Sequence, residues 1–342
     1  MSAFEKELGN SSKNISKILK SKSVSWSLVV LTSLLLAPFI GVYPVLILKI
    51  LCFALFACSF NLLIGFTGLL SFGHAAFFGG AGYIFGYFMK SWGIPAEIGI
   101  ILGVGFGAIL GYVIGSLAIK RQGIYFAMIT LALAQMVYFI FLQTPFTGGE
   151  DGLQGIPRGK LFGFIPLDSD LVTYYFVLGV VLLAFLAIVR IVNSPYGQIL
   201  RAIKENEPRA VSLGYDTNRF KLIAFVTSAS FSALAGSLKA LVLGFATLTD
   251  VHWTMSGSVI LMTLVGGLGT LTGPILGAVL IVMLENKIGE IGFFLAEVTG
   301  IQWFETLGQS VPMVTGIIFI ICVLSFRQGI VGIFTRVCRP GR

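Results

Sequence analysis

The chain alternates long apolar stretches with short polar ones, and most apolar stretches have the length of a membrane-spanning helix. A helix needs about 20 apolar residues to cross the roughly 30 Å of hydrocarbon in a bilayer, so the chain has material for about nine or ten spans. The predicted spans are 26–42, 43–65, 69–89, 94–117, 123–142, 171–192, 221–243, 254–267 with 273–287, and 309–326. The pattern predicts an all-α fold, a polytopic transmembrane helix bundle with broken or re-entrant segments.

A charged segment, residues 193–220, separates two of these spans and has a helical period of its own. Its apolar and charged residues fall on opposite faces of a predicted helix. The apolar face holds Ile199, Leu200, Ile203, Ala210 and Val211, and the charged face holds Arg201, Lys204, Glu205 and Arg209. Such a helix either lies in the headgroup layer of a bilayer or docks a soluble partner.

Composition supports a membrane protein. Apolar residues fill 56% of the 342 positions and charged residues only 11%, and the mean hydropathy is +0.94. A soluble domain of this length cannot bury so much apolar surface. The four cysteines have no CxxC spacing and no histidine nearby, which predicts neither a disulfide framework nor a metal site.

The net charge of +8 reports orientation, because Lys and Arg gather at span ends and in both tails. With the basic tail 1–25 in the cytoplasm, 143–170 is outside, and 193–220 and the basic tail 327–342 are inside. The first apolar stretch lacks a small-residue cleavage site, so we expect a retained span within a transmembrane domain at 26–326.

This orientation requires an even number of crossings between Asp250 and Glu290. The two apolar arms there, 254–267 and 273–287, have only about 14 residues each, short of a comfortable span. The sequence GGLGTLTGP between them predicts a tight hairpin or a re-entrant pair. Glu290, Glu297 and Glu305 then belong outside.

Glycine is clustered along the chain, which has 42 of them. Gly103, Gly107, Gly111 and Gly115 recur every fourth residue and leave a groove in which another backbone can approach closely. A second series consists of Gly269, Gly273 and Gly277. Because lipid provides no hydrophobic drive for helix association, we expect these grooves to pack the bundle.

Two segments break helical regularity at membrane depth: NLLIGFTGLLSFGHAAFFGGAGY, residues 61–83, and LVGGLGTLTGPILGA, residues 264–278. Non-helical backbone is tolerated there only where protein buries it or where it lines a watery cavity. Paired interruptions of this kind indicate a transporter's pathway. The alternative is that the glycines serve packing alone and that His74 is a hydrogen-bonded core residue.

Charges within the predicted spans are rare. Lys49 and Lys239 lie near the outer ends of their spans, where their side chains can reach the surface, and neither has an obvious carboxylate partner within a span. The lack of Asp and Glu at mid-depth disfavours a proton-driven pump or a sodium-coupled carrier. No G-x-x-x-x-G-K-[ST] motif provides an ATP site. An intramembrane enzyme is disfavoured too, since neither histidine has a partnering glutamate or nucleophile.

Five segments in series resemble the LivM-type permease subunit of bacterial branched-chain amino acid ABC transporters. They are the run 61–83, GIYFAMITLALAQ, TPFTGGEDGLQGIP, SPYGQILRAIKENEPRAVSLGYDTNRFKLIAFVTSA and LMTLVGGLGTLTGPILGA. They occur in the family's order, and the resemblance extends over about residues 43–285. The resemblance implies a permease in the bacterial cytoplasmic (inner) membrane. It works with a second permease subunit, two cytoplasmic ATPase subunits and an external substrate-binding protein that delivers leucine, isoleucine or valine. It implies no cofactor in this chain, because the partner subunits hydrolyse ATP.

Under this resemblance the charged segment corresponds to the coupling loop that sits in an ATPase cleft, as a degenerate relative of the EAA---G loop of other importers. The candidate coupling residues are Arg201, Lys204, Glu205, Glu207, Arg209 and Gly214.

A zwitterion with a small aliphatic side chain would need helix ends or exposed backbone for its carboxylate and small apolar walls for its side chain. The candidates for path or gate are Ser71, Gly73, His74, Phe77, Thr130, Gln135, Gly266, Gly267 and Thr270.

Two departures from the family's usual pattern stand out: an extra glycine before Tyr83, and Lys239 where an uncharged residue is more usual. Related permeases carry urea or short amides with nearly the same motifs, so this substrate class stays open. A passive channel or membrane scaffold without ATP is a hypothesis of another class, and it predicts a charged segment that binds no ATPase.

Overall fold

The computed structural model describes Pro38, residues 43–161, 163–167 and 169–299, and five residues between Met313 and Ile320. Side chains are described up to Lys287 and for those five. Almost all of the predicted spans 26–42 and 309–326, and both tails, lie outside the described residues. The chain divides after Ile47 into two units, and the second holds all of the described helices except the first residues of α2.

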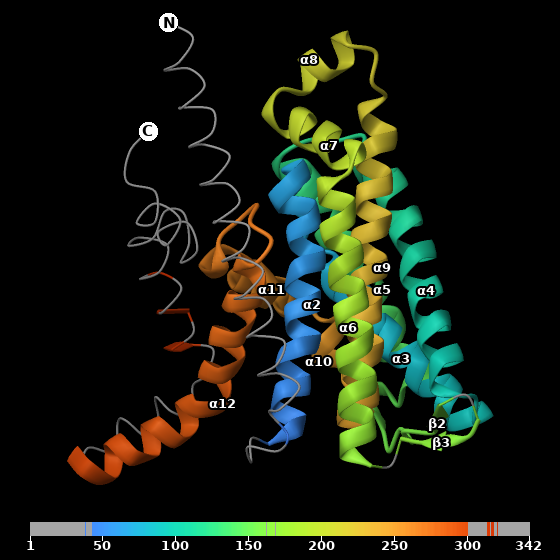
Figure 1. Ribbon diagram of the computed structural model, residues 1–342, viewed down its shortest axis with the longest axis vertical. Helices are drawn as coiled ribbons and strands as arrows, with labels where there is room; N and C mark the ends of the chain where they lie inside the picture. Colours follow the sequence, from blue (N-terminus) through green and yellow to red (C-terminus); the bar gives the residue numbers. More distant parts are fainter. Residues whose placement is uncertain are drawn as a thin grey trace, which may run out of the picture. The chain divides into compact units, whose positions relative to one another are not determined.

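The described part of the chain is almost entirely helical, as predicted. Five helices are long and apolar enough to cross a membrane: α2 (Pro44–Thr67), α4 (Ala96–Ala118), α5 (Ile124–Gln143), α6 (Asp170–Asn193) and α9 (Thr217–Leu243). Figure 1 shows α2, α4, α6 and α9 as long ribbons that run in roughly the same direction. The chain is therefore a multi-pass membrane protein built as a helix bundle.

The first predicted break is present. Residues 68–73 are not helical and separate α2 from α3 (His74–Trp92). Gly68 has a φ of +76°, which a residue with a side chain adopts only with strain. The prediction of a span from residue 69 was wrong at its start, because the turn at Gly68 delays the helix until His74.

The second break is also present, between α11 (Trp253–Gly266) and α12 (Gly273–Thr299). The two helices approach so closely that a Cβ on Gly277 would lie 1.8 Å from the Met262 carbonyl oxygen. The second arm is longer than predicted, since α12 continues to Thr299. Glu290 and Glu297 therefore lie on the continuation of α12, because no proline stops the helix after residue 287. Their place outside the membrane stays a prediction, and Glu305 lies outside the described residues.

The charged segment forms two helices, α7 (Pro195–Glu205) and α8 (Glu207–Ser212), where a single helix was predicted. Asn206 separates them with an extended backbone, and its side chain caps α8 by accepting from the Arg209 amide at 3.1 Å. Pro208 explains the break, because the preceding residues cannot hold helical geometry against its ring. As a result Val211 is 55% exposed instead of sharing the buried face of α7.

The two ends of the bundle differ. Figure 1 shows α7 and α8 at one end and the strands β2 (Lys160–Leu161) and β3 (Ile165–Pro166) at the other. The loop at this second end, residues 144–169, also holds the short helices η2 (Pro145–Thr147) and η3 (Gly149–Asp151). Its strand β1 (Leu153–Gln154) pairs antiparallel with β4 (Phe245–Ala246), which follows α9, and α10 (Leu248–Val251) comes next.

The predicted glycine groove on α4 is confirmed, and α9 fills it. A Cβ added to Gly103 would lie 2.2 Å from Ser237 Oγ, and one added to Gly107 would lie 2.2 Å from the Ala233 Cβ. Small residues on both helices let their backbones approach, which is how helices associate without a hydrophobic drive from water.

Candidate functional site

The helix α7 is fixed to the end of the bundle by its apolar face. Leu200 is fully buried in a cluster with Phe77, Phe126 and Phe225. Tyr196 donates its hydroxyl hydrogen to the Phe220 carbonyl at 3.0 Å. Burial raises the pKa of the Tyr196 hydroxyl above its usual range, so the group stays a donor at neutral pH. These contacts seat α7 on the spans.

Glu207 fixes α8 in the same way, although the sequence suggested a role in partner contact. One carboxylate oxygen pairs with the buried Lys221 ammonium at 2.5 Å, and the other accepts from Gln122 Nε2 at 3.0 Å. Glu207 thus joins α8 to the start of α9 and to the turn between α4 and α5. Its side chain is only 22% exposed, so its charge is used within the chain.

The outward face of the two helices carries charged and apolar side chains together. Of the predicted coupling residues, Arg201, Lys204, Glu205, Arg209 and Gly214 are exposed. The exposed apolar residues of α8 and its C-terminal turn include Val211 and Leu213, at 55% and 69%. A surface hollow of about 370 Å³ lies beside them, lined by Gln122, Glu207, Pro208 and Val211.

The first break is tightly hydrogen-bonded. Thr130 Oγ1 on α5 accepts from the Phe72 amide at 3.2 Å, and Ser71 Oγ accepts from the Gly73 amide at 3.1 Å. Ser256 on α11 accepts from the Ala75 amide at 2.9 Å. The structure therefore brings the predicted residues Ser71, Gly73 and Thr130 together, and it adds Ser256 from a distant helix.

His74 lies beside this break in a fully buried polar chain. Its Nε2 is 2.8 Å from Ser228 Oγ, and the Ser228 hydroxyl donates to the Ser59 carbonyl at 2.5 Å. Because that hydroxyl has one hydrogen, His74 Nε2 must carry the ring proton and donate it to Ser228. The Nδ1 atom is then a bare acceptor with no hydrogen-bond partner among the described residues. The rings of Phe60, Phe77 and Phe225 surround it.

The second break is held by α2. Asn61 donates from Nδ2 to the Thr270 carbonyl at 2.8 Å and accepts at Oδ1 from the Gly269 amide at 3.0 Å. Within the turn, Thr270 Oγ1 donates to the Gly267 carbonyl at 2.8 Å. A Cβ on Gly266 would lie 1.9 Å from the Gly273 carbonyl oxygen, so the turn is closed as tightly as its backbone allows.

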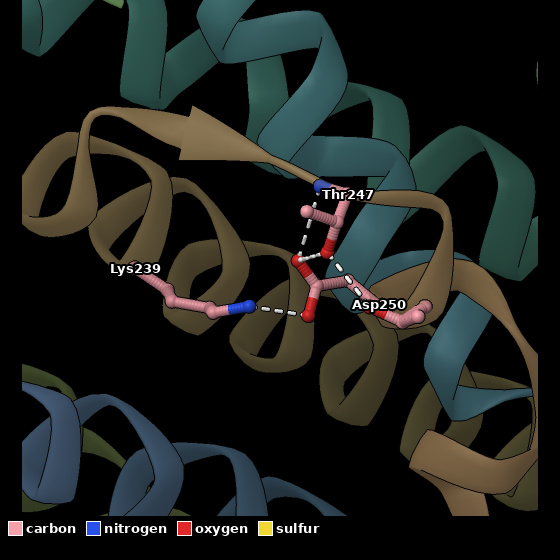
Figure 2. A network of polar contacts seen from close by, with 4 residues as sticks. Lys239, Thr247 and Asp250 are labelled. Carbon is pink, nitrogen blue, oxygen red and sulfur yellow. Dashed lines mark hydrogen bonds and ion pairs between the residues drawn. The ribbon is translucent and has the colours of Figure 1, made fainter. Parts of the chain in front are cut away.

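A buried ion pair lies near the other end of the bundle. The Lys239 ammonium on α9 contacts Asp250 Oδ1 on α10, and the two side chains are 9% and 6% exposed. Asp250 Oδ2 accepts from the Thr247 amide at 3.4 Å and from its hydroxyl at 3.1 Å, as Figure 2 shows. The expectation that the Lys239 side chain reaches the surface was wrong, because the residue is buried against a carboxylate that lies outside the predicted spans. Asp250 comes after the span ends, and the turn through β4 brings it back to the helix.

The predicted path residues do not form one cluster. Phe77 packs beside His74, and Gln135 lies half-buried on α5. The second break contacts Asn61 and the end of α2, and Asn61 was not among the predicted site residues. Ser228, Asp250 and Lys221 were missed as well, because no sequence signal marks a lone serine or charge as the partner of a residue on another helix.

The family comparison decides the class of the chain. The model of the branched-chain amino acid transport system / permease component family matches residues 45–323. The chain belongs to this family. Together with the five apolar helices, membership makes it a permease-type transport subunit that crosses the membrane several times.

Individual relatives agree with this assignment. The chain is similar to the high-affinity branched-chain amino acid transport system permease protein LivM of Salmonella typhimurium, at 29% identity over 65% of this chain and 58% of that protein. The Escherichia coli LivM protein matches at 28% identity over the same shares. A fructose import permease protein of Rhizobium meliloti matches at 24% identity, over 58% of this chain and 57% of that protein.

The chain thus spans somewhat more than half the length of these curated relatives. No solved structure matches it.

Proposed function

We propose that this chain is the membrane-spanning permease subunit of an ATP-driven importer of branched-chain amino acids. The family, the names of the LivM relatives and the absence of a Walker-type ATP motif from the sequence support this role. The energy then comes from two cytoplasmic ATPase subunits, and the chain itself catalyses no reaction.

The observation that carries the proposal is the pair of helices α7 and α8. Their inner sides are fixed to the spans through Leu200, Tyr196 and Glu207, while their outer sides present exposed charged and apolar residues. A rigid projection of this kind can pass a partner's movement to the helices that hold it. A passive channel has no need for such an element.

The full assembly would contain a second, related permease and an external binding protein that delivers the amino acid. The proposed orientation, in the bacterial cytoplasmic membrane, puts α7, α8 and both tails in the cytoplasm and the loop 144–169 outside. Lys120 and Arg121 lie in the turn at the α8 end, as the positive-inside rule expects. One relative is named as a fructose import permease, so membership of the family does not by itself fix the substrate.

The test uses the chain co-expressed with the two ATPase subunits and reconstituted in vesicles. A triple variant of exposed residues, Glu205→Ala, Arg209→Ala and Leu213→Ala, should lose co-purification of the ATPase and nucleotide-dependent leucine uptake by about tenfold or more, because interface centres dominate binding energy. The matched control changes Glu150, Lys160 and Phe164 to alanine at the opposite end, and it should keep the ATPase bound.

The proposal would be wrong if the triple variant bound the ATPase and took up leucine like the unmodified chain. Uptake that needs no ATPase subunit at all would favour the passive channel instead.

A further inference from the structure

The C-terminal end of α2 lies between two elements that are far apart in the sequence. On one side it contacts Lys204 of α7, and on the other it contacts the turn of residues 267–272 between α11 and α12.

The contact with α7 is made through the backbone of α2. Lys204 Nζ donates to the Gly65 carbonyl at 2.8 Å. This carbonyl belongs to the last turn of α2, which ends at Thr67, so no helical amide is available to it. A cation is also favoured at the negative end of a helix dipole. The stem of Lys204 crosses Gly68 so closely that a Cβ there would lie 3.2 Å from Lys204 Cγ.

The contact with the turn is made through the Asn61 side chain. Its amide donates to Thr270 and accepts from Gly269, so both functions of the amide are used on the same turn. Asn61 is 3% exposed, so water does not compete for the hydrogen bonds of its side-chain amide. Two hydrogen bonds from one planar group fix both the distance and the orientation of the turn relative to α2.

Gly65 joins the two contacts. Its carbonyl receives Lys204, and a Cβ on its α-carbon would lie 2.3 Å from Asn61 Oδ1 and 2.9 Å from the Gly269 amide nitrogen. Any displacement of this residue by α7 therefore presses on the atoms that hold the turn. The turn contains Gly267 and Gly269, with φ values of 122° and 73°, and the wide conformational range of glycine lowers the cost of changing the backbone at these two positions.

We propose that Lys204, Gly65 and Asn61 form a relay that passes the displacement of α7 to the turn of residues 267–272. Lys204 and Asn61 are positioning residues, which couple nucleotide hydrolysis to the opening of the second break. This inference rests on the proposed function for its transport consequence. The physical link itself, from α7 through α2 to the turn, is independent of the cargo.

The test compares Lys204→Met with Lys90→Met. Both lysines donate one hydrogen bond of 2.8 Å to a backbone carbonyl, Lys204 to Gly65 and Lys90 to Gln154 at the other end of the bundle. Lys204 is exposed, and methionine keeps the apolar stem, so the variant is expected to fold. A second variant, Asn61→Leu, removes the clamp on the turn.

The first readout is the amount of leucine taken up per ATP hydrolysed by the reconstituted complex. Lys204→Met should lower the uptake per ATP about tenfold, a typical size for energetic coupling between two sites. Because the ratio is taken per ATP hydrolysed, a weaker contact with the ATPase subunits does not by itself change it. Lys90→Met should leave the ratio unchanged. The double variant Lys204→Met, Asn61→Leu should lose no more than the worse single variant, since both act in one series.

The second readout is hydrogen exchange at the amides of residues 267–272, measured in the same complex without nucleotide. Lys204→Met should speed this exchange severalfold although Lys204 does not itself hydrogen-bond to the turn, and Lys90→Met should not. Unchanged exchange in Lys204→Met, or uptake and hydrolysis that fall in proportion, would overturn the relay. A complex without nucleotide-dependent uptake would overturn the proposed function, while the exchange data would still decide the link.

Discussion

Lys239 and Asp250 place two opposite charges in the packed interior between α9 and α10 (Figure 2). Taking charges out of water costs free energy that mutual attraction recovers only with good geometry and further hydrogen bonds. Thr247 supplies those hydrogen bonds to the second carboxylate oxygen. The pair therefore holds the start of α10 against the end of α9.

We predict that Lys239→Met lowers the free energy of unfolding by about 3–5 kcal/mol, because it leaves the Asp250 carboxylate buried without its cation. Replacing both residues, as Lys239→Met with Asp250→Leu, should restore much of that loss. Thermal denaturation in detergent measures both effects.

The matched control is Arg158→Met. It breaks the ion pair with Asp170, whose side chain is 61% exposed, and should cost only about 0–1 kcal/mol. A single Lys239 variant as stable as this control would contradict the account of the buried pair.

The sequence could indicate which residues are polar within the bundle but not their partners. His74 was predicted either as part of a path or as a hydrogen-bonded core residue, and the structure shows its hydrogen bond to Ser228 across two helices. Asp250 was missed because the chain reverses between Gly244 and α10, and pairing across a reversal leaves no periodic signal. Asn61 was seen as an interruption of α2, while its two hydrogen bonds to the distant turn could come only from the fold.

At the scale of elements, the glycine groove on α4 was the feature most readable from sequence. A glycine at every fourth position marks one face of a helix without any knowledge of the partner. The structure supplies the partner, α9, whose alanines and serines fill the groove.

Gly107→Val should destabilise the bundle by about 1–3 kcal/mol, because its added atoms overlap Ala233 and force the helices apart. Gly105→Val is the control on the same helix, since nothing lies within 4 Å of a Cβ at that position. Both glycines gain the same side chain, so a difference in thermal stability between the two variants isolates the contact with α9. Equal stabilities would show that the groove does not bear on packing.

The charged segment shows the limit of periodicity. Its amphipathic pattern correctly predicted that Leu200 and Ile203 are buried, but Pro208 ends the pattern at Asn206 and turns Val211 outward. The proline was visible in the sequence, and its effect on the residue before it is a general rule. Glu207 could not have been assigned in this way, because its partners Lys221 and Gln122 come from two other elements.

At the scale of the whole molecule, three of the residues proposed to line a path, Ser71, His74 and Thr130, are fully buried. His74 on α3 is hydrogen-bonded to Ser228 on α9, and Thr130 on α5 accepts from the Phe72 amide in the first break. The roles of all nine predicted path residues stay predictions.

For the path we predict that a His74→Ala, Thr130→Ala double variant transports leucine more slowly in reconstituted vesicles, by about tenfold, because repositioned groups near a transported ligand have effects of this size. A Thr227→Ala, Ser230→Ala variant is the control, since both hydroxyls bond only to carbonyls of their own helix. Transport at the unmodified rate by the first variant, with normal assembly, would remove these residues from the path.

The pairing of β1 with β4 has a consequence for any partner that binds the loop of residues 144–169. The β1–β4 pairing joins this loop to the strand just after α9. A hydrogen bond of 2.8 Å from the Ile156 amide to the Gly244 carbonyl adds to it. The same strand leads into Asp250, and the opposite tip of α9 is tied to α8 through Lys221. A force applied to this loop at one end of the bundle is therefore transmitted along the single helix α9 to the other end.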